Sequence, residues 1–192
     1  MNGDAILTAE GVGKTFGAFR ALRDVSVAFP RGRLTSIIGP NGAGKSTLFN
    51  VISGALRPTE GRVVFEGRDI TGLSQHMLPR LGIAKSYQIT SLFPRLTALE
   101  NVRIAAQALV SRFGMWRPRS ALPGLVGEAP ALLEGVGLGT RLGVPAAGLA
   151  HGEQRALEIA VALASRPRLL LLDEPTAGMS PEETRAIMEL IV

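Results

Sequence analysis

The chain contains no cysteine, so it can form no disulfide and offers no thiolate to a metal ion or a substrate. The absence of cysteine is consistent with a reducing cytosol. Long apolar segments are also missing: the longest run of leucine, isoleucine and valine covers only residues 169–172, whereas a membrane-spanning helix needs roughly 20 residues. Residues 1–10 lack the basic and apolar segments of a secretory signal. We therefore expect a chain that stays where it is made and meets a membrane only peripherally.

Clustered charge of one sign is absent as well. The net charge is +5, and the arginines are scattered from Arg20 to Arg185 rather than gathered in one block. Nucleic-acid-binding domains usually carry a basic stripe or patch, so nucleic acid is not an expected partner. What the chain does contain is 46% hydrophobic residues in a length of 192, enough for one globular domain with a buried core.

The first third of the sequence combines strand signals with a glycine-rich loop. Alternating segments at 5–9 and 25–29 predict two strands of an antiparallel flap. Residues 34–38 predict a short apolar strand that runs into the glycine-rich segment, and residues 45–53 have helical character. Residues 62–65 predict a further strand. The order strand, glycine-rich loop, helix is the context that a phosphate-binding loop requires.

Two helices and a buried strand are predicted further along. Residues 97–109 form a helix capped by Thr97, with Glu100 at the capping-box position. Residues 151–165 form an amphipathic helix, and the apolar residues 169–172 form a strand of the kind found in the centre of a parallel sheet. On the amphipathic helix, Leu157, Ala160, Val161 and Ala164 share one face, while Gln154, Arg155 and Glu158 fall on other faces.

Residues 39–46, GPNGAGKS, match the phosphate-loop pattern G-x-x-x-x-G-K-[ST]. Glycines let backbone N–H groups point at phosphate oxygens, and the following helix N-terminus adds partial positive charge. We expect Lys45 to reach the β- and γ-phosphates, Ser46 to place its hydroxyl on Mg²⁺, and Thr47 to reach the α-phosphate. The predicted site for ATP and Mg²⁺ comprises Gly39, Pro40, Asn41, Gly42, Ala43, Gly44, Lys45, Ser46 and Thr47.

Two acidic residues follow the apolar strand at 169–172. Asp173 and Glu174 stand at its carboxyl end, which is where open α/β sheets bind ligands. We expect Asp173 to hold the Mg²⁺ shell and Glu174 to polarise or deprotonate the attacking water. Two acids could also merely end a strand, but beside a phosphate loop the catalytic interpretation is favoured.

These motifs, with Gln88 and the segments LAHGEQ at 149–154 and LLLLDEPTAG at 169–178, resemble ABC transporter ATPase subunits in order and spacing. The resemblance implies that Gln88 contacts Mg²⁺ and the attacking water. It also implies that Phe16 stacks on adenine, although Phe16 could also belong to the core, as we expect for Phe19.

In the same family a signature of the form LSGGQ or LSGGE begins a helix and completes the ATP site of a partner subunit. The resemblance places Leu149, Gly152 and Glu153 in this role. The family's serine and first glycine are Ala150 and His151 here. A hydroxyl donor to the phosphate is thereby lost, and His151 is either phosphate-facing or an ordinary surface residue.

Residues 92–102, an insert at 110–130 and residues 177–181 resemble ATPases of branched-chain amino-acid importers, and ATPases for urea or amides share this pattern closely. The resemblance implies import of branched-chain amino acids or related small solutes. It implies a second ATPase subunit in a homo- or heterodimer, transmembrane permease subunits, and a peripheral location on the cytoplasmic face of the membrane. The insert contains Trp116 among arginines; a solvated loop is favoured over a lipid-headgroup contact. A soluble ABC ATPase and a non-catalytic ATP-binding fragment are the alternatives.

The fold implied is α/β: a P-loop NTPase core with a parallel sheet, an N-terminal antiparallel β subdomain and a helical subdomain. Residues 1–88 and 166–192 are expected to form the core with its flap, and residues 89–165 the helical signature subdomain. A helix is expected at 181–192. The family's phosphate-sensing histidine would follow later, so we expect a C-terminally truncated domain that binds Mg-ATP but turns it over poorly.

Overall fold

The computed structural model describes residues 4–85, 92–110, 127–173 and 185, of which residues 108–110 are described by their backbone alone. The chain divides into two compact units, one ending at Leu81 and the other beginning at Gly82. Within the described residues, every helix is too short or too polar to cross a bilayer. The subdomain breaks predicted after residues 88 and 165 stay predictions.

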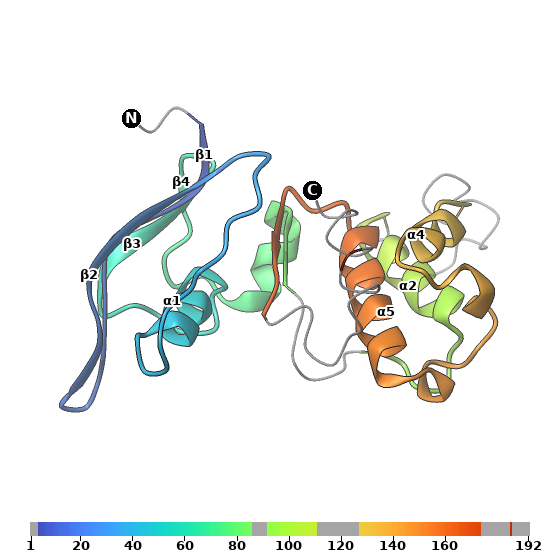
Figure 1. The fold of residues 1–192 in the computed structure, drawn as a ribbon. Helices are drawn as coiled ribbons and strands as arrows, with labels where there is room; N and C mark the ends of the chain where they lie inside the picture. The colour runs from blue at the N-terminus through green and yellow to red at the C-terminus, as the bar shows by residue number, and fades with distance from the viewer. Residues whose placement is uncertain (1–3, 86–91, 111–126, 174–184, 186–192) are drawn as a thin grey trace. The chain divides into compact units, whose positions relative to one another are not determined.

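The first unit is built on an antiparallel sheet with strand order β2-β1-β3-β4 (Figure 1). The strands are β1 (Ala5–Phe16), β2 (Phe19–Pro30), β3 (Glu60–Phe65) and β4 (Arg68–Asp69). Buried apolar side chains on one sheet face, among them Leu7, Val12 and Val63, supply the core of this unit. The predicted flap is therefore confirmed, and its first two strands are longer than the sequence pattern indicated.

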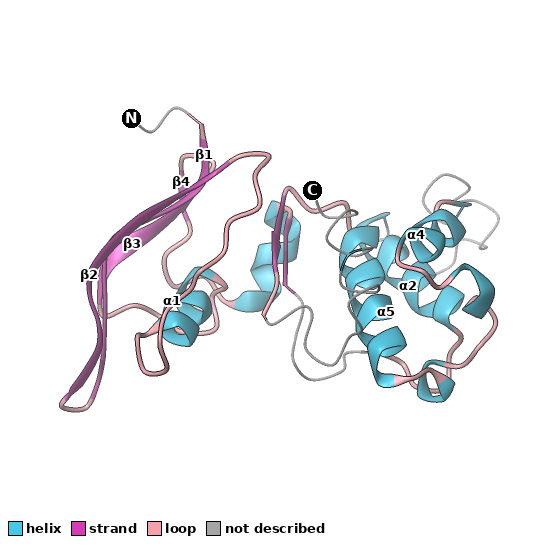
Figure 2. Cartoon of the chain, in the orientation of Figure 1, coloured by secondary structure: helices cyan, strands magenta, loops and turns pink. Residues whose placement is uncertain are grey.

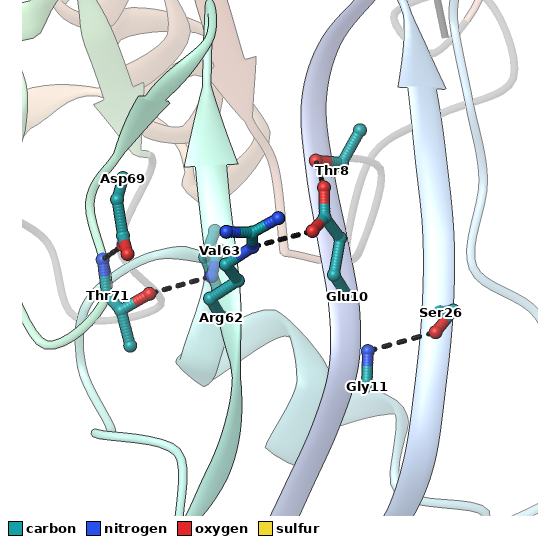
Figure 3. Close-up of polar contacts among 8 residues, drawn as sticks. All are labelled: Thr8, Glu10, Gly11, Ser26, Arg62, Val63, Asp69 and Thr71. Atoms are coloured by element: carbon teal, nitrogen blue, oxygen red, sulfur yellow. Dashed lines mark hydrogen bonds and ion pairs between the residues drawn. The ribbon is translucent and has the colours of Figure 1, made fainter. Parts of the chain in front are cut away.

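Polar side chains tie neighbouring strands of this sheet together (Figure 3). Arg62 on β3 donates from Nε to Glu10 Oε2 on β1 at 2.7 Å, and this hydrogen bond holds the pKa of Glu10 below its ordinary value. Past β4, the Thr71 hydroxyl accepts the Val63 N–H at 2.9 Å. Thr71 also donates to Asp69, which lowers the pKa of that carboxyl group. These contacts fix strand register at the solvated side of the sheet.

Helix α1 (Lys45–Ile52) follows the glycine-rich loop as predicted, but the strand predicted at 34–38 is not formed. The segment between β2 and α1 runs as loop and turn (Figure 2). A strand needs a neighbour to accept and donate its ladder hydrogen bonds, and among the described residues this segment has no ladder partner. Leu34 is 50% and Ile38 is 89% exposed, so these apolar side chains are not buried as those of a central strand would be. The apolar pattern alone was therefore not sufficient to form a strand.

In the described part of the second unit, helices α2 (Ala98–Val110), α4 (Ala129–Gly135) and α5 (His151–Ala164) pack around one core. Its core combines small residues such as Ala98 and Ala160 with Val102, Leu133 and Leu157, all fully buried. The capping box of α2 is confirmed, because Thr97 Oγ1 accepts the Glu100 N–H at 3.2 Å while Glu100 accepts the Thr97 N–H at 3.0 Å. Short 3₁₀ turns η3 (Gly139–Arg141) and η4 (Ala146–Gly148) lead into α5.

A parallel pair of strands completes the second unit. β5 (Ile83–Lys85) pairs with β6 (Leu169–Leu171), with Ile83 opposite Leu169 and Lys85 opposite Leu171. The parallel strand predicted at 169–172 is therefore confirmed. The helix predicted at 181–192, apart from Arg185, and most of the insert at 110–130 lie outside the described residues.

Candidate nucleotide-binding site

The glycine-rich loop owes its shape to two glycines with left-handed backbone angles. Gly42 has a φ of 81° and Gly44 a φ of 85°, a region that glycine enters without the steric penalty of a side chain. Gly44 also lies against β2: a Cβ atom at this position would come within 2.8 Å of Leu22 Cδ2 and 2.9 Å of the Ala21 carbonyl oxygen. The second glycine of the motif is thus required both by its backbone angle and by its contact with the flap.

Lys45 lies directly after this loop and points back into it. Its Nζ donates hydrogen bonds to the carbonyl oxygens of Gly39 and Pro40, both at 2.8 Å. The ammonium group is therefore held inside the curve of the loop, which is the position from which a lysine neutralises a bound phosphate group. The loop residues Asn41, Gly42 and Ala43 are exposed, so their backbone is open to a ligand.

The N-terminus of α1 adds further positive potential. The first helical hydrogen bond found here runs from Leu48 N to Gly44 O at 2.8 Å, so the backbone N–H groups just before Leu48 belong to the helix start, where intrahelical acceptors are lacking. The first turn of α1 contains no acidic residue. Glycine-rich loop, lysine and helix N-terminus together fit the phosphates of a nucleotide.

The predicted Mg²⁺ ligands are oxygen-bearing side chains, the type that this ion prefers. Among the described residues, no group of three or more histidine, aspartate or glutamate side chains could enclose a metal ion. Magnesium commonly takes one or two protein oxygens and completes its shell with substrate phosphates and water. Ser46, exposed at the start of α1, and Asp173, at the end of β6, are the described side chains predicted for this purpose.

An exposed aromatic ring lies near the turn of the β1–β2 hairpin. Phe16 is 45% exposed, and the Lys14 ammonium lies 5.1 Å from its ring centroid while donating to the Arg57 carbonyl oxygen at 2.8 Å. Phe16 is thus available for stacking. Phe19, expected from the sequence in the core, is 66% exposed, so that expectation was wrong. Phe19 pairs with Phe16 across the hairpin, where the short turn leaves its ring beyond the buried part of the sheet.

Just after β6, Asp173 interacts with two basic residues of the same unit, one through a hydrogen bond and one through its charge. Arg155 on α5 donates from Nη2 to the Asp173 carbonyl oxygen at 2.5 Å. Lys85, at the end of β5, has a pKa lowered by partial burial, and the charge of Asp173 opposes this shift. Neither basic residue was predicted from the sequence as part of this site. The predicted catalytic residues Gln88 and Glu174 lie outside the described residues.

The predicted signature segment forms the start of α5. Glu153 accepts the Ala150 N–H at 2.9 Å and pairs with Arg141 Nε at 2.9 Å, and these hydrogen bonds lower the pKa of its carboxyl group. Leu149 and Gly152 are buried, whereas His151 is exposed. Ala150 has no side-chain acceptor, so Glu153 and the Gln154 amide, which donates to the Leu149 carbonyl at 3.1 Å, organise this helix start.

The loop geometry, Lys45 and the open N-terminus of α1 define the class of protein: a P-loop nucleotide-binding protein with an antiparallel flap and a helical unit. Comparison with known proteins narrows this class. The family model described as ABC transporter matches residues 22–177. The chain therefore belongs to the ABC transporter family, among its ATP-binding ATPase subunits.

Curated relatives in bacteria and archaea are described as branched-chain amino acid transport ATP-binding proteins. The chain is 34% identical over 193 residues to the high-affinity branched-chain amino acid transport ATP-binding protein of Escherichia coli, covering 97% of this chain and 75% of that protein. It is 38% identical to the Pseudomonas aeruginosa counterpart, with the same shares covered. A probable counterpart in Methanocaldococcus jannaschii is 39% identical, over 92% of this chain and 70% of that protein.

Solved structures support the same assignment. The ADP conformation of an ATP-binding cassette of an ABC transporter has a TM-score of 0.81 and 35% identity, covering 97% of this chain and 75% of that one. A dimeric ATP-binding cassette bound to ADP and phosphate, in a post-hydrolysis state, has a TM-score of 0.79 and 30% identity, covering 96% and 81%. The predicted fold class, with its P-loop core, parallel sheet, flap and helical subdomain, is confirmed.

Proposed function

We propose that this chain binds Mg-ATP through residues 39–47 and hydrolyses it to power the import of branched-chain amino acids or related small solutes. The observation that carries the proposal is the position of Lys45, whose ammonium group is held within the loop at 2.8 Å from two backbone carbonyl oxygens. The exposed Phe16 supplies a stacking surface for adenine. Family membership supports nucleotide binding in general.

Each proposed residue has a distinct task. Lys45 and the backbone amides of the loop bind and orient the phosphates. Ser46, Asp173 and Gln88 would hold Mg²⁺, which when bound neutralises charge on the phosphates. Glu174 takes a proton from the attacking water, or orients it, as a general base.

The proposed partners are a second ATPase subunit and a pair of transmembrane permease subunits. Support for pairing comes from the dimeric structure of a relative. In such a dimer the signature at Leu149, Gly152 and Glu153 would complete the ATP site of the partner through the N-terminus of α5, and nucleotide binding would close the pair. Docking on permease subunits would place the chain on the cytoplasmic face of the membrane.

The transported solute is proposed from the relatives, which are described as branched-chain amino acid transport proteins. Deleting the gene in its own organism should abolish high-affinity uptake of radiolabelled leucine, isoleucine and valine, and the wild-type gene should restore it. A Lys45→Ala gene should not restore uptake. Unchanged uptake of all three amino acids in the deletion strain would refute this substrate class while leaving the ATPase proposal intact.

The enzymatic part of the proposal is tested on the purified chain. Mg-ATP should raise its melting temperature, since ligand binding stabilises the folded state by mass action. Glu174→Gln should retain this shift and lose any ATP turnover that the wild-type chain shows. A Glu174→Gln variant that hydrolyses ATP at the wild-type rate would remove Glu174 from the catalytic role. ATP binding by wild type without turnover would favour a non-catalytic nucleotide-binding module.

A further inference from the structure

Arg155 is buried on α5, although its spacing from the apolar residues suggested a face away from the core. Its side chain is 8% exposed. Its Nη1 donates to Glu158 Oε2 at 2.7 Å, one helical turn along α5, and its Nη2 donates to the backbone carbonyl oxygen of Asp173 at 2.5 Å. One guanidinium group therefore connects the helix that begins with the signature segment to the end of β6.

The physical properties of arginine make this connection a stiff one. A buried charge is unfavourable unless hydrogen bonds and an opposite charge compensate it, and Glu158, whose side chain is 10% exposed, provides the opposite charge. The planar guanidinium group then fixes the directions of its N–H donors relative to one another. With Nη1 held by Glu158 on the same helix, Nη2 points at the Asp173 carbonyl group and restrains the backbone of Asp173.

Glu158 balances the charge of the guanidinium group, but the other N–H donors of this buried group also need acceptors, and the hydrogen bond from Nη2 satisfies one of them. Its acceptor belongs to Asp173, the residue proposed to hold Mg²⁺ from the carboxyl end of β6. Partners of metal-binding residues that do not touch the metal themselves typically alter metal affinity by ~10–100-fold when they are removed. The position of the Asp173 carboxylate depends on the position of the Asp173 backbone, so restraining this backbone also restrains the carboxylate.

We propose that Arg155 is a positioning residue for Mg-ATP, acting through the backbone of Asp173 and linking the strand end to α5. The proposal rests on the proposed function of Asp173 as a Mg²⁺ ligand. It gives Arg155 no contact with nucleotide. Because α5 starts at the signature segment, this contact also connects the segment proposed to serve the partner's ATP site with the residue proposed to serve the chain's own site.

The test is the Mg²⁺ dependence of ATP binding, measured by isothermal titration of the full 192-residue chain in MgCl₂ and in EDTA. Arg155→Met should lower the Mg²⁺ affinity of the ATP complex by ~10–100-fold while changing ATP affinity in EDTA by less than about twofold, since the phosphate loop is untouched. Arg155→Lys, which retains a charged donor, should recover part of the loss. Equal Mg²⁺ affinity in wild type and Arg155→Met would overturn the proposal.

A double variant separates positioning from stability. Arg155→Met combined with Glu158→Leu replaces the buried ion pair by apolar side chains, which is often neutral for stability, so its urea midpoint should return toward wild type while its Mg²⁺ affinity stays low. Arg166→Met, which breaks the exposed pair with Glu128 at 2.5 Å, is the matched control and should bind Mg²⁺ normally. Recovery of Mg²⁺ affinity in the double variant would show that Arg155 is only structural. If wild type fails to bind ATP in either buffer, the proposed function itself fails.

Discussion

The ammonium group of Lys45 lies 2.8 Å from the carbonyl oxygen of Gly39, six residues earlier in the chain. This hydrogen bond folds the lysine back over the loop that precedes it, so the positive charge is positioned before any ligand arrives. A pre-positioned charge needs little rearrangement when an anion binds, which favours affinity.

Gly44→Ala should destabilise the chain more than Gly42→Ala. Both glycines have left-handed φ angles, so both variants carry a backbone penalty of roughly 1–2 kcal/mol. Only at Gly44 does the new Cβ collide with Leu22 and Ala21, whereas the space at Gly42 is open. Urea unfolding of both variants checks this difference. Equal free energies of unfolding would contradict the packing of the loop against β2.

Phe16→Leu should weaken ATP binding by roughly 5–150-fold, the equivalent of the ~1–3 kcal/mol lost with one aromatic stacking contact. Binding of inorganic triphosphate should be unchanged, because the phosphate loop remains. Phe93→Leu, which changes an exposed ring in the other unit, is the control and should bind ATP normally. A parallel loss of ATP and triphosphate affinity in Phe16→Leu would point to a damaged flap rather than a missing base contact.

Asn101 is a strong candidate for a stability determinant. It is 3% exposed, accepts the Phe93 N–H at 2.8 Å, and donates to the carbonyl oxygens of Phe93, Leu96 and Thr97. Asn101→Ala should lower the free energy of unfolding by roughly 2–3 kcal/mol, because buried backbone groups lose their partner. Asn101→Asp should cost more at pH 7, where a carboxylate would face carbonyl oxygens, and should recover on acidification. Wild-type stability of the aspartate variant at pH 7 would refute the described contacts.

The lowered pKa of Glu153 predicts how the stability of the fold depends on pH. Its pKa in the folded chain is lowered from 4.5, chiefly by the Ala150 N–H and further by Arg141. A depressed folded-state pKa stabilises the fold above the unfolded-state pKa, and this contribution disappears as the pH falls through the folded-state value. The stability difference between wild type and Glu153→Gln, from urea unfolding, should therefore be constant at pH values well above the ordinary pKa of a glutamate and shrink as the pH falls below it. A stability difference between wild type and Glu153→Gln that grows as the pH falls would contradict a lowered pKa of Glu153.

The sequence predicted those features that local chemistry determines. The phosphate loop needs glycines and a lysine at fixed spacing, and the cap of α2 needs Thr97 and Glu100 three residues apart, so both could be recognised from a short segment. The strand expected at 34–38 could not be predicted reliably from its own residues, because strand formation depends on a partner elsewhere in the chain. Arg155 was missed for a similar reason: its hydrogen-bond partner Asp173 lies 18 residues later in the chain, and helical spacing does not encode this contact.

The central claim, that residues 39–47 bind ATP through Lys45, is tested most directly by ATP affinity in Lys45→Ala. Removing this cation should lower ATP affinity by at least about 100-fold, since charge-assisted hydrogen bonds contribute roughly 1.5–3 kcal/mol each. Arg68→Ala, which removes one exposed positive charge from β4, should bind ATP as wild type does. Isothermal titration with both variants gives the answer. ATP affinity in folded Lys45→Ala equal to that of wild type would contradict the account.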